Sequence, residues 1–108
     1  MPTTFIAFEV SRQMLIELRP ILAVIARHDR QLKNQVQDAA TSVHLNLGES
    51  RGRRGGDRRR CFEIAAGSAG EVDAGLDVAV AWGWIAEDCP VRRTVGRLGA
   101  ILCALCRS

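Results

Sequence analysis

Apolar residues recur every three to four positions along most of the chain, which is the spacing of one face of an α-helix. Four stretches follow this period, over residues 5–27, 32–47, 62–83 and 91–105. Alternation of apolar and polar residues with a period of two, which is typical of a half-buried strand, is nowhere convincing. The pattern therefore predicts four amphipathic helices and no sheet.

The sequence also carries signals for where these helices begin and end. Asp29, Asp57 and Asp88 each precede an apolar stripe, and a carboxylate at that position can accept hydrogen bonds from the free amide groups of a first turn. Pro90 further supports a start of the fourth helix after Asp88, because proline is favoured at the first helical position. We expect the second helix to run down to residue 48 and the third to end near Trp84.

Proline and glycine interrupt two of the predicted helices. Pro20 removes a backbone hydrogen bond and its ring crowds the preceding turn, so we expect a kink over residues 16–20 or a helix that begins there. Gly67, Gly70 and Gly75 lie inside the third helix, where each glycine costs about 1 kcal/mol relative to alanine. We expect close approach of another backbone, within the bundle or from a second subunit, beside Gly67 and Gly70.

Length and composition favour one small, all-α domain over residues 1–108. Four helices with short connections predict an antiparallel up-and-down four-helix bundle. The chain is 47% hydrophobic with only five aromatic residues, so its core should be mostly aliphatic. Charged residues interrupt every apolar run well before the roughly 20 residues of a membrane span, and no secretory signal is evident. We therefore expect a cytoplasmic protein whose four cysteines are reduced thiols: Cys61, Cys89, Cys103 and Cys106.

Positive charge is concentrated at the joint between the second and third helices. Six arginines lie within ten residues: Arg51, Arg53, Arg54, Arg58, Arg59 and Arg60. With Asp57 this segment carries +5, while the other 98 residues carry nine basic and eleven acidic side chains, a balance of −2. Guanidinium groups match phosphate oxygens, and the amino end of a helix adds partial positive charge. The segment is a candidate nucleic-acid-binding site on a loop over residues 51–56. One alternative is a solvated loop kept soluble by its charge, and another is pairing of the arginines with nearby carboxylates such as Asp57 and Glu63.

A second constellation is polar and flanks the arginines. Asn46 and Glu49 are three residues apart before them, and Ser68 and Glu71 are three residues apart after them. On antiparallel neighbouring helices these four side chains could meet near one end of the bundle, and we expect a hydrogen-bonded network that fixes helix register. A carboxylate metal site is the alternative, but the Glu-x-x-His pairs that such bundle sites use are absent from the sequence.

Other chemistry has little support in the sequence. Cys103 and Cys106 form a lone CxxC near a helix carboxyl end, whereas redox pairs use the amino end, and a zinc site needs two more ligands. No nucleotide-binding, Ser-His-Asp or HExxH motif occurs, so we expect no enzyme, no cofactor and no metal. Trp82 and Trp84 are interpreted as core and interface anchors at the end of the third helix rather than as a ligand cage.

Two spaced motifs on either side of the arginines resemble those of a bacterial family. The matching positions are Leu32, Gln35, Ala39, Ser42, Asn46 and Glu49, followed by Phe62, Ala65, Gly67, Ser68 and Glu71. The sequence resembles the four helix bundle protein family, first noticed as reading frames in the intervening sequences of 23S ribosomal RNA genes. Asp38 stands where that family commonly has arginine.

That family is similar to the accessory protein of diversity-generating retroelements, a basic ring of five bundles that works with a reverse transcriptase and RNA. The resemblance implies a homo-oligomer, a homopentamer by analogy, with a nucleic-acid role and a reverse transcriptase as partner. Two hypotheses follow. The bundle binds RNA or DNA backbone through its arginines, or it is a protein–protein interaction scaffold that binds no nucleic acid.

Overall fold

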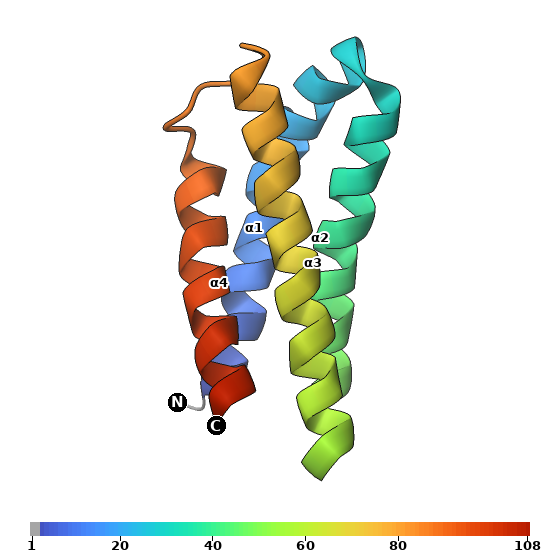
Figure 1. Ribbon diagram of the computed structural model, residues 1–108, viewed down its shortest axis with the longest axis vertical. Coiled ribbons are helices and arrows are strands. Elements are labelled where there is room, and N and C mark those ends of the chain that lie inside the picture. Colours follow the sequence, from blue (N-terminus) through green and yellow to red (C-terminus); the bar gives the residue numbers. More distant parts are fainter. Residues whose placement is uncertain (1–2) are drawn as a thin grey trace.

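Four α-helices make up most of residues 3–108, the part of the chain that this computed structural model describes. They are α1 (Thr3–His28), α2 (Arg30–Ser50), α3 (Gly55–Ala81) and α4 (Pro90–Arg107), and residues 3–108 contain no strand. Successive helices run in opposite directions (Figure 1). α1 and α3 each pack against α2 and α4, so the predicted antiparallel up-and-down bundle is confirmed.

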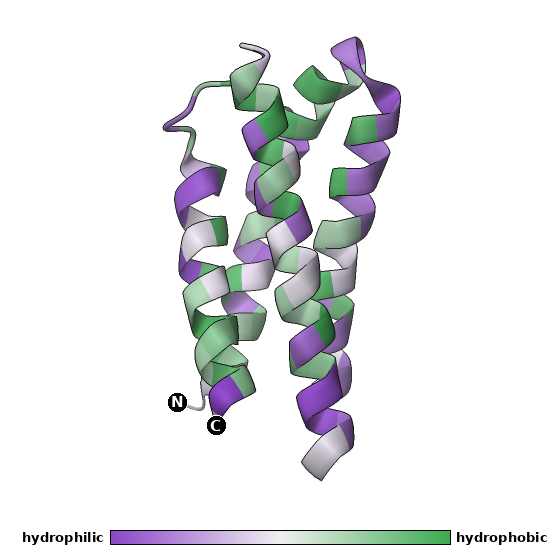
Figure 2. Ribbon diagram, in the orientation of Figure 1, coloured by the Kyte–Doolittle hydropathy of each residue, from purple (hydrophilic) through white to green (hydrophobic). Residues whose placement is uncertain are grey.

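The core follows the apolar stripes that predicted the helices. Each helix contributes fully buried aliphatic side chains, and Figure 2 shows apolar residues recurring along all four ribbons. Burying one such side chain contributes roughly 1.5–3 kcal/mol. The bundle measures 42 × 23 × 20 Å, so a long apolar seam rather than a compact centre holds it together. The largest members of this core are Met14, Leu18, Ile25, Leu47, Leu76, Leu98 and Leu102.

Only one of the three predicted aspartate caps is used. Asp29 caps α2, since its Oδ1 accepts a hydrogen bond from the Leu32 amide at 2.9 Å. The other two predictions are wrong. α3 begins two residues before Asp57, because Gly55 with φ of +57° turns the chain straight into the helix. α4 begins at Pro90 with Cys89 as its N-cap.

α3 ends at Ala81, earlier than the predicted end near Trp84. Gly83 has φ of +78°, and its amide donates to the Val80 carbonyl oxygen while the Trp84 amide donates to that of Ala79. This pair of hydrogen bonds satisfies the last carbonyl groups and reverses the chain. Trp84 packs against the core, whereas Trp82 is 70% exposed, so Trp82 is not a core residue. Its predicted role as an interface anchor stays a prediction.

Pro20 does not start a new helix. α1 is continuous from Thr3 to His28, with Pro20 exposed on its surface, so that alternative is wrong. The kink stays a prediction.

The close approach between helices occurs at Gly75, not beside Gly67 and Gly70. A Cβ atom built on Gly75 would lie 2.4 Å from Cγ2 of Val36, whereas one on Gly67 or Gly70 would have nothing within 4 Å. The predicted approach within the bundle is therefore displaced along α3. Gly67 and Gly70 are not buried, so the other half of that expectation, contact with a second subunit, stays a prediction.

Candidate functional site

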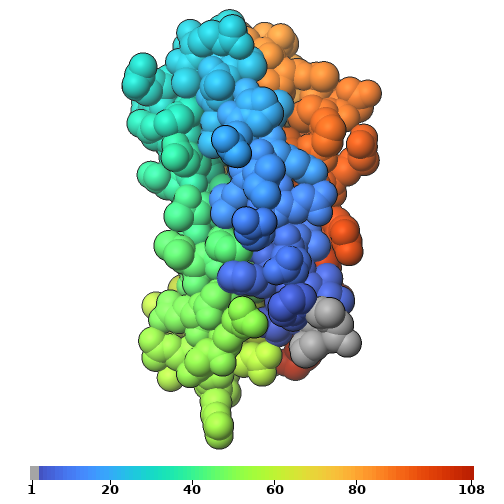
Figure 3. Space-filling view, turned by 180° about the vertical axis from the view of Figure 1, so that it is seen from behind, coloured from blue at the N-terminus to red at the C-terminus, as the bar shows by residue number. Residues whose placement is uncertain are grey.

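We call residues 51–60, which hold the six arginines, the arginine joint. Its connection between α2 and α3 is only four residues long, Arg51–Arg54, because α3 begins at Gly55 rather than after residue 56 as predicted. The amides of Arg51, Gly52 and Arg53 donate to carbonyl oxygens three residues back, at 3.1–3.3 Å, so α2 ends in a tight last turn. The joint lies at the tip of the α2–α3 pair and projects beyond the neighbouring helices (Figures 1 and 3).

All ten residues of the arginine joint are exposed. Hydrophilic residues gather on the last turns of α2 and the first turns of α3, at the lower end of Figure 2. The joint is therefore a protruding polar tip, as predicted, and every guanidinium in it is open to solvent on at least one side.

Three of the arginines rest on neighbouring side chains and helix ends. Arg51 lies over the ring of Phe8, with 5.2 Å between its guanidinium carbon and the ring centroid. Arg58 lies over Phe62 at 5.3 Å and donates a hydrogen bond to Thr4 Oγ1 at 3.0 Å. Arg59 donates to the main-chain oxygen of Ser108, the residue after α4, at 3.2 Å. The partners of Arg51 and Arg58 are neutral, so they orient these two guanidinium groups and leave their charge uncompensated.

Only one arginine of the joint pairs with an Asp or Glu side chain among residues 3–108. Arg53 pairs with Glu49 at 2.8 Å, in the i, i+4 arrangement of an exposed helix pair. Arg54 and Arg60 make no ion pair and no side-chain hydrogen bond within the described residues. The predicted alternative, pairing with Asp57 and Glu63, is absent from the described structure.

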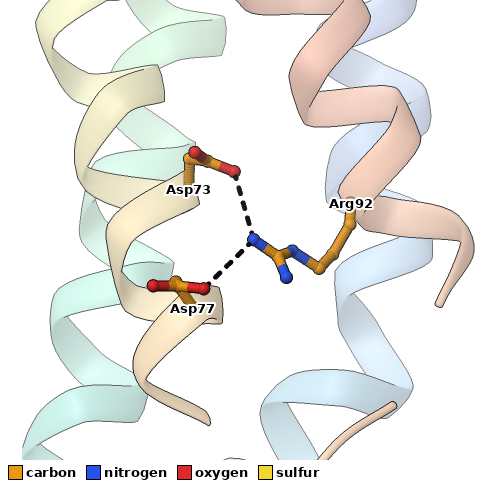
Figure 4. A network of polar contacts seen from close by, with 3 residues as sticks. All are labelled: Asp73, Asp77 and Arg92. Atoms are coloured by element: carbon orange, nitrogen blue, oxygen red, sulfur yellow. Dashed lines mark hydrogen bonds and ion pairs between the residues drawn. The ribbon is translucent and has the colours of Figure 1, made fainter. Parts of the chain in front are cut away.

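Arg92, in contrast to the arginines of the joint, has its charge compensated by carboxylates. It reaches from α4 to two carboxylates on α3, at 3.5 Å to Asp77 and 4.0 Å to Asp73 (Figure 4). Its side chain is only 20% exposed. The contrast with the joint shows that most of the positive charge there is left available to an external anion.

The amino end of α3 adds to the positive character of the joint. Its N-cap is Arg54, whose side chain makes no capping hydrogen bond, and only Asp57 supplies negative charge in the first turn. Free amides at a helix amino end favour anions. Beside them lies an open hollow of about 500 Å³, lined by Gly55, Gly56, Arg58, Arg59, Phe62, Leu105 and Ser108.

The predicted polar network forms only in part. Ser68 donates to Ser42 Oγ at 2.9 Å, and Asn46 donates to the Ser42 carbonyl oxygen at 2.9 Å, so α2 and α3 are joined through a serine that the prediction left out. Glu49 pairs with Arg53 instead, and Glu71 is exposed with no side-chain hydrogen bond among residues 3–108. Glu49 and Glu71 therefore do not belong to the network.

A buried polar pair that the sequence did not reveal ties α1 to α2. Ser11 is fully buried; its hydroxyl donates to the Phe8 carbonyl oxygen at 2.7 Å and is hydrogen-bonded to His44 Nδ1 at 2.7 Å. The His44 ring also stacks on Phe8, with centroids 4.2 Å apart. Burial lowers the pKa of His44 below its ordinary value of 6.5, and the Arg12 charge lowers it further, while Glu9 acts in the opposite direction. In the sequence, the only sign of this pair was a small polar residue, Ser11, within the apolar stripe of the first helix.

The remaining candidate groups do not converge. All four cysteines are free thiols, and residues 3–108 contain no cluster of three or more groups suited to a metal ion. Burial raises the pKa of the Cys106 thiol, with the Glu63 and Cys103 charges adding to this and Arg59 opposing it. The thiolate needed for redox chemistry is thus disfavoured. None of the helices in residues 3–108 combines the length and hydropathy that spanning a bilayer requires.

Comparison with known proteins places the chain in a family. Residues 5–92, well over half of the chain, match the model of the 23S rRNA-intervening sequence protein family, and the chain belongs to that family. The fold also matches the crystal structure of a Bacteroides thetaiotaomicron protein of unknown function from the S23 ribosomal protein family. The TM-score is 0.86 at 12% sequence identity, over 99% of this chain and 100% of that one. No curated protein matches the sequence.

Proposed function

We propose that this protein is a non-enzymatic, self-associating helical bundle that binds the phosphate backbone of RNA or DNA through the arginine joint. The observation that carries the proposal is the lack of compensation at a protruding tip: of six exposed arginines, only Arg53 pairs with an Asp or Glu side chain within residues 3–108. Neighbouring guanidinium charges repel one another; a phosphate that joins them relieves this repulsion, and its oxygens fit their paired donors.

The proposed contact is to the backbone rather than to bases. The rings beside the joint lie beneath its guanidinium groups, Phe5 and Phe8 beneath Arg51 and Phe62 beneath Arg58. Contacts to phosphates carry no sequence information, so binding should tolerate any sequence. The resemblance to the retroelement accessory protein makes RNA the favoured polymer and a reverse transcriptase the favoured protein partner.

Self-association is supported by an apolar seam on the outside of α3. Ile64 and Val78 are 41% and 42% exposed and lie on the same side of α3, fourteen residues apart. Gly67, Glu71 and Ala74 lie between them at helical spacing, so the seam is apolar except for one exposed carboxylate. An open groove of about 620 Å³ runs beside this seam between α2 and α3. An exposed apolar stripe of this kind is typical of a surface that another subunit covers. The proposed number of subunits, five, comes from the resemblance alone.

Binding of a fluorescently labelled single strand, followed by anisotropy over a series of salt concentrations, tests the arginine joint. Arg54→Gln with Arg60→Gln removes two charges that have no partner within the described residues. The slope of log affinity against log salt should fall by about 0.7 for each phosphate that the variant no longer neutralises. Replacing all six arginines by glutamine should abolish binding.

The matched control removes two other exposed arginines without ion pairs, Arg19→Gln with Arg97→Gln. Its net charge equals that of the test variant, so any difference between the two reports position rather than charge. Equal affinity and equal slope in the two double variants would reject the arginine joint as the site. If the unaltered protein bound no strand at low salt, the proposed nucleic-acid binding would be rejected in favour of the scaffold hypothesis.

The seam is tested separately by light scattering. Val78→Glu places a charge in the proposed contact and should convert the assembly to single chains, while the same change at Ala100, exposed on α4, should not. A mass of one chain for the unaltered protein would reject self-association.

A further inference from the structure

Three aromatic rings form a stacked ladder at the end of the bundle opposite the arginine joint. The rings of His28 and Trp84 are 4.8 Å apart and nearly parallel, at 5°. Trp82 lies 6.3 Å from Trp84, with its ring inclined by 20°. The ladder joins the end of α1 to the end of α3, at the upper end of Figure 1.

The backbone turn that ends α3 builds this ladder. Gly83, in the left-handed region, reverses the chain so that residues 82 and 84 leave the helix with their rings stacked. Trp84 packs against the core and is thereby fixed, while Trp82 is 70% exposed, more than any other large apolar residue in 3–108. An exposed ring of this size does not gain the free energy of removing its apolar surface from water, and a ligand that covered the ring would supply that free energy.

We propose that the Trp82–Trp84–His28 ladder is a stacking site for the bases of single-stranded nucleic acid. Near-parallel aromatic rings with one exposed member present a flat face, and every base has a matching flat face. Two exposed arginines lie within two residues of His28 in the sequence, Arg27 and Arg30, and neither has an ion pair within the described residues. Asp29 between them is engaged as the cap of α2.

Glu87 and Asp88, exposed in the connection between α3 and α4, keep this end of the molecule from being strongly cationic. Recognition here therefore depends on ring stacking rather than on charge. Bases in a duplex are stacked on each other, so the ladder selects unpaired strands. This inference rests on the proposed function for the identity of the polymer, and it adds bases to the phosphates bound at the other end of a bundle 42 Å long.

Intrinsic fluorescence isolates the ladder from the rest of the protein. The chain has two tryptophans and no tyrosine, and both tryptophans are in the ladder. Uridine 5′-monophosphate should quench this emission saturably, while ribose 5-phosphate, which has the same phosphate and no base, should not. Equal response to the two compounds, or none to either, would overturn the inference.

Substitution of Trp82 distinguishes binding of a nucleic-acid base from binding of an apolar protein partner. With a labelled oligouridine strand, Trp82→Leu should weaken binding by at least about five-fold, and Trp82→Phe should retain most of it. Because Trp82 is exposed, both variants should melt within a few degrees of the unaltered protein, which circular dichroism checks. Unchanged affinity in Trp82→Leu would overturn the inference.

The two proposals fail in different ways. If the strand binds in an arginine-dependent manner without quenching of tryptophan, the ladder is rejected and the arginine joint stands. If the mononucleotide quenches tryptophan while strand binding ignores the joint arginines, the proposed function is rejected and the ladder stands.

Discussion

Replacing Gly75 by alanine should destabilise the bundle, although alanine is the better helix former. Gly75 is buried where α3 meets α2, and a Cβ atom there would lie 2.4 Å from Cγ2 of Val36, with Leu32 Cδ1 at 3.8 Å. Val36 is 1% exposed, and a β-branched side chain in a helix has one strongly preferred rotamer. It cannot move aside without displacing the core or the helix.

The magnitude is the difference between two opposing terms. Alanine gains about 1 kcal/mol over glycine in a helix interior. Overpacking a filled site by one methyl group costs about 1–3 kcal/mol. We therefore expect Gly75→Ala to lower the free energy of unfolding by up to about 2 kcal/mol, measured by urea unfolding followed with circular dichroism.

Two further variants isolate the cause. Gly70→Ala is on the same helix, is exposed and meets nothing within 4 Å, so it should raise stability by up to about 1 kcal/mol. Gly75→Ala made in a Val36→Ala background has room for its methyl group and should also be stabilising. If Gly75→Ala in the unaltered background stabilises the protein as much as Gly70→Ala, the reasoning from close packing is refuted.

Three other changes test the local interactions of the fold. Asp29→Ala removes the carboxylate that caps α2 through the Leu32 amide and should cost about 1 kcal/mol in urea unfolding, whereas Asp29→Asn should cost little; equal losses would argue against a capping role. Because burial lowers the folded-state pKa of His44, the unfolded chain binds the proton more readily, so stability present above pH 6.5 should fall as the pH drops below it. His44→Asn should flatten this pH dependence, and an unchanged slope would contradict the assignment. Asp77→Asn should change stability by less than about 0.5 kcal/mol, because that carboxylate is 71% exposed and 3.5 Å from Arg92; a loss above about 1 kcal/mol would show that the pair is stronger than its geometry indicates.

The sequence by itself determined the elements of the fold and the location of its charge. Four stripes of period 3.6 can bury their apolar faces only against one another, and short connections force neighbouring helices to be antiparallel. The arginine cluster was recognisable as an exposed tip because six guanidinium groups within ten residues cannot be buried together.

Which signal governs each helix end was not readable from the sequence. Asp29, Asp57 and Asp88 look alike in it, yet only Asp29 is a cap, because Gly55 and Pro90 set the starts of α3 and α4. The sequence likewise did not show that the hydroxyl group of Ser42 would join α2 to α3.

Tertiary structure alone decided the pairings across helices. The close approach at Gly75, the Ser11–His44 hydrogen bond and the position of Arg51 over Phe8 all depend on the axial register of one helix against the next. That register is set by the packing of whole side-chain surfaces, whereas the period of a stripe specifies only which face of a helix is buried. The same packing leaves Trp82 outside and Trp84 against the core; both residues lie beyond the end of α3, in the turn at Gly83, where the helical period no longer applies.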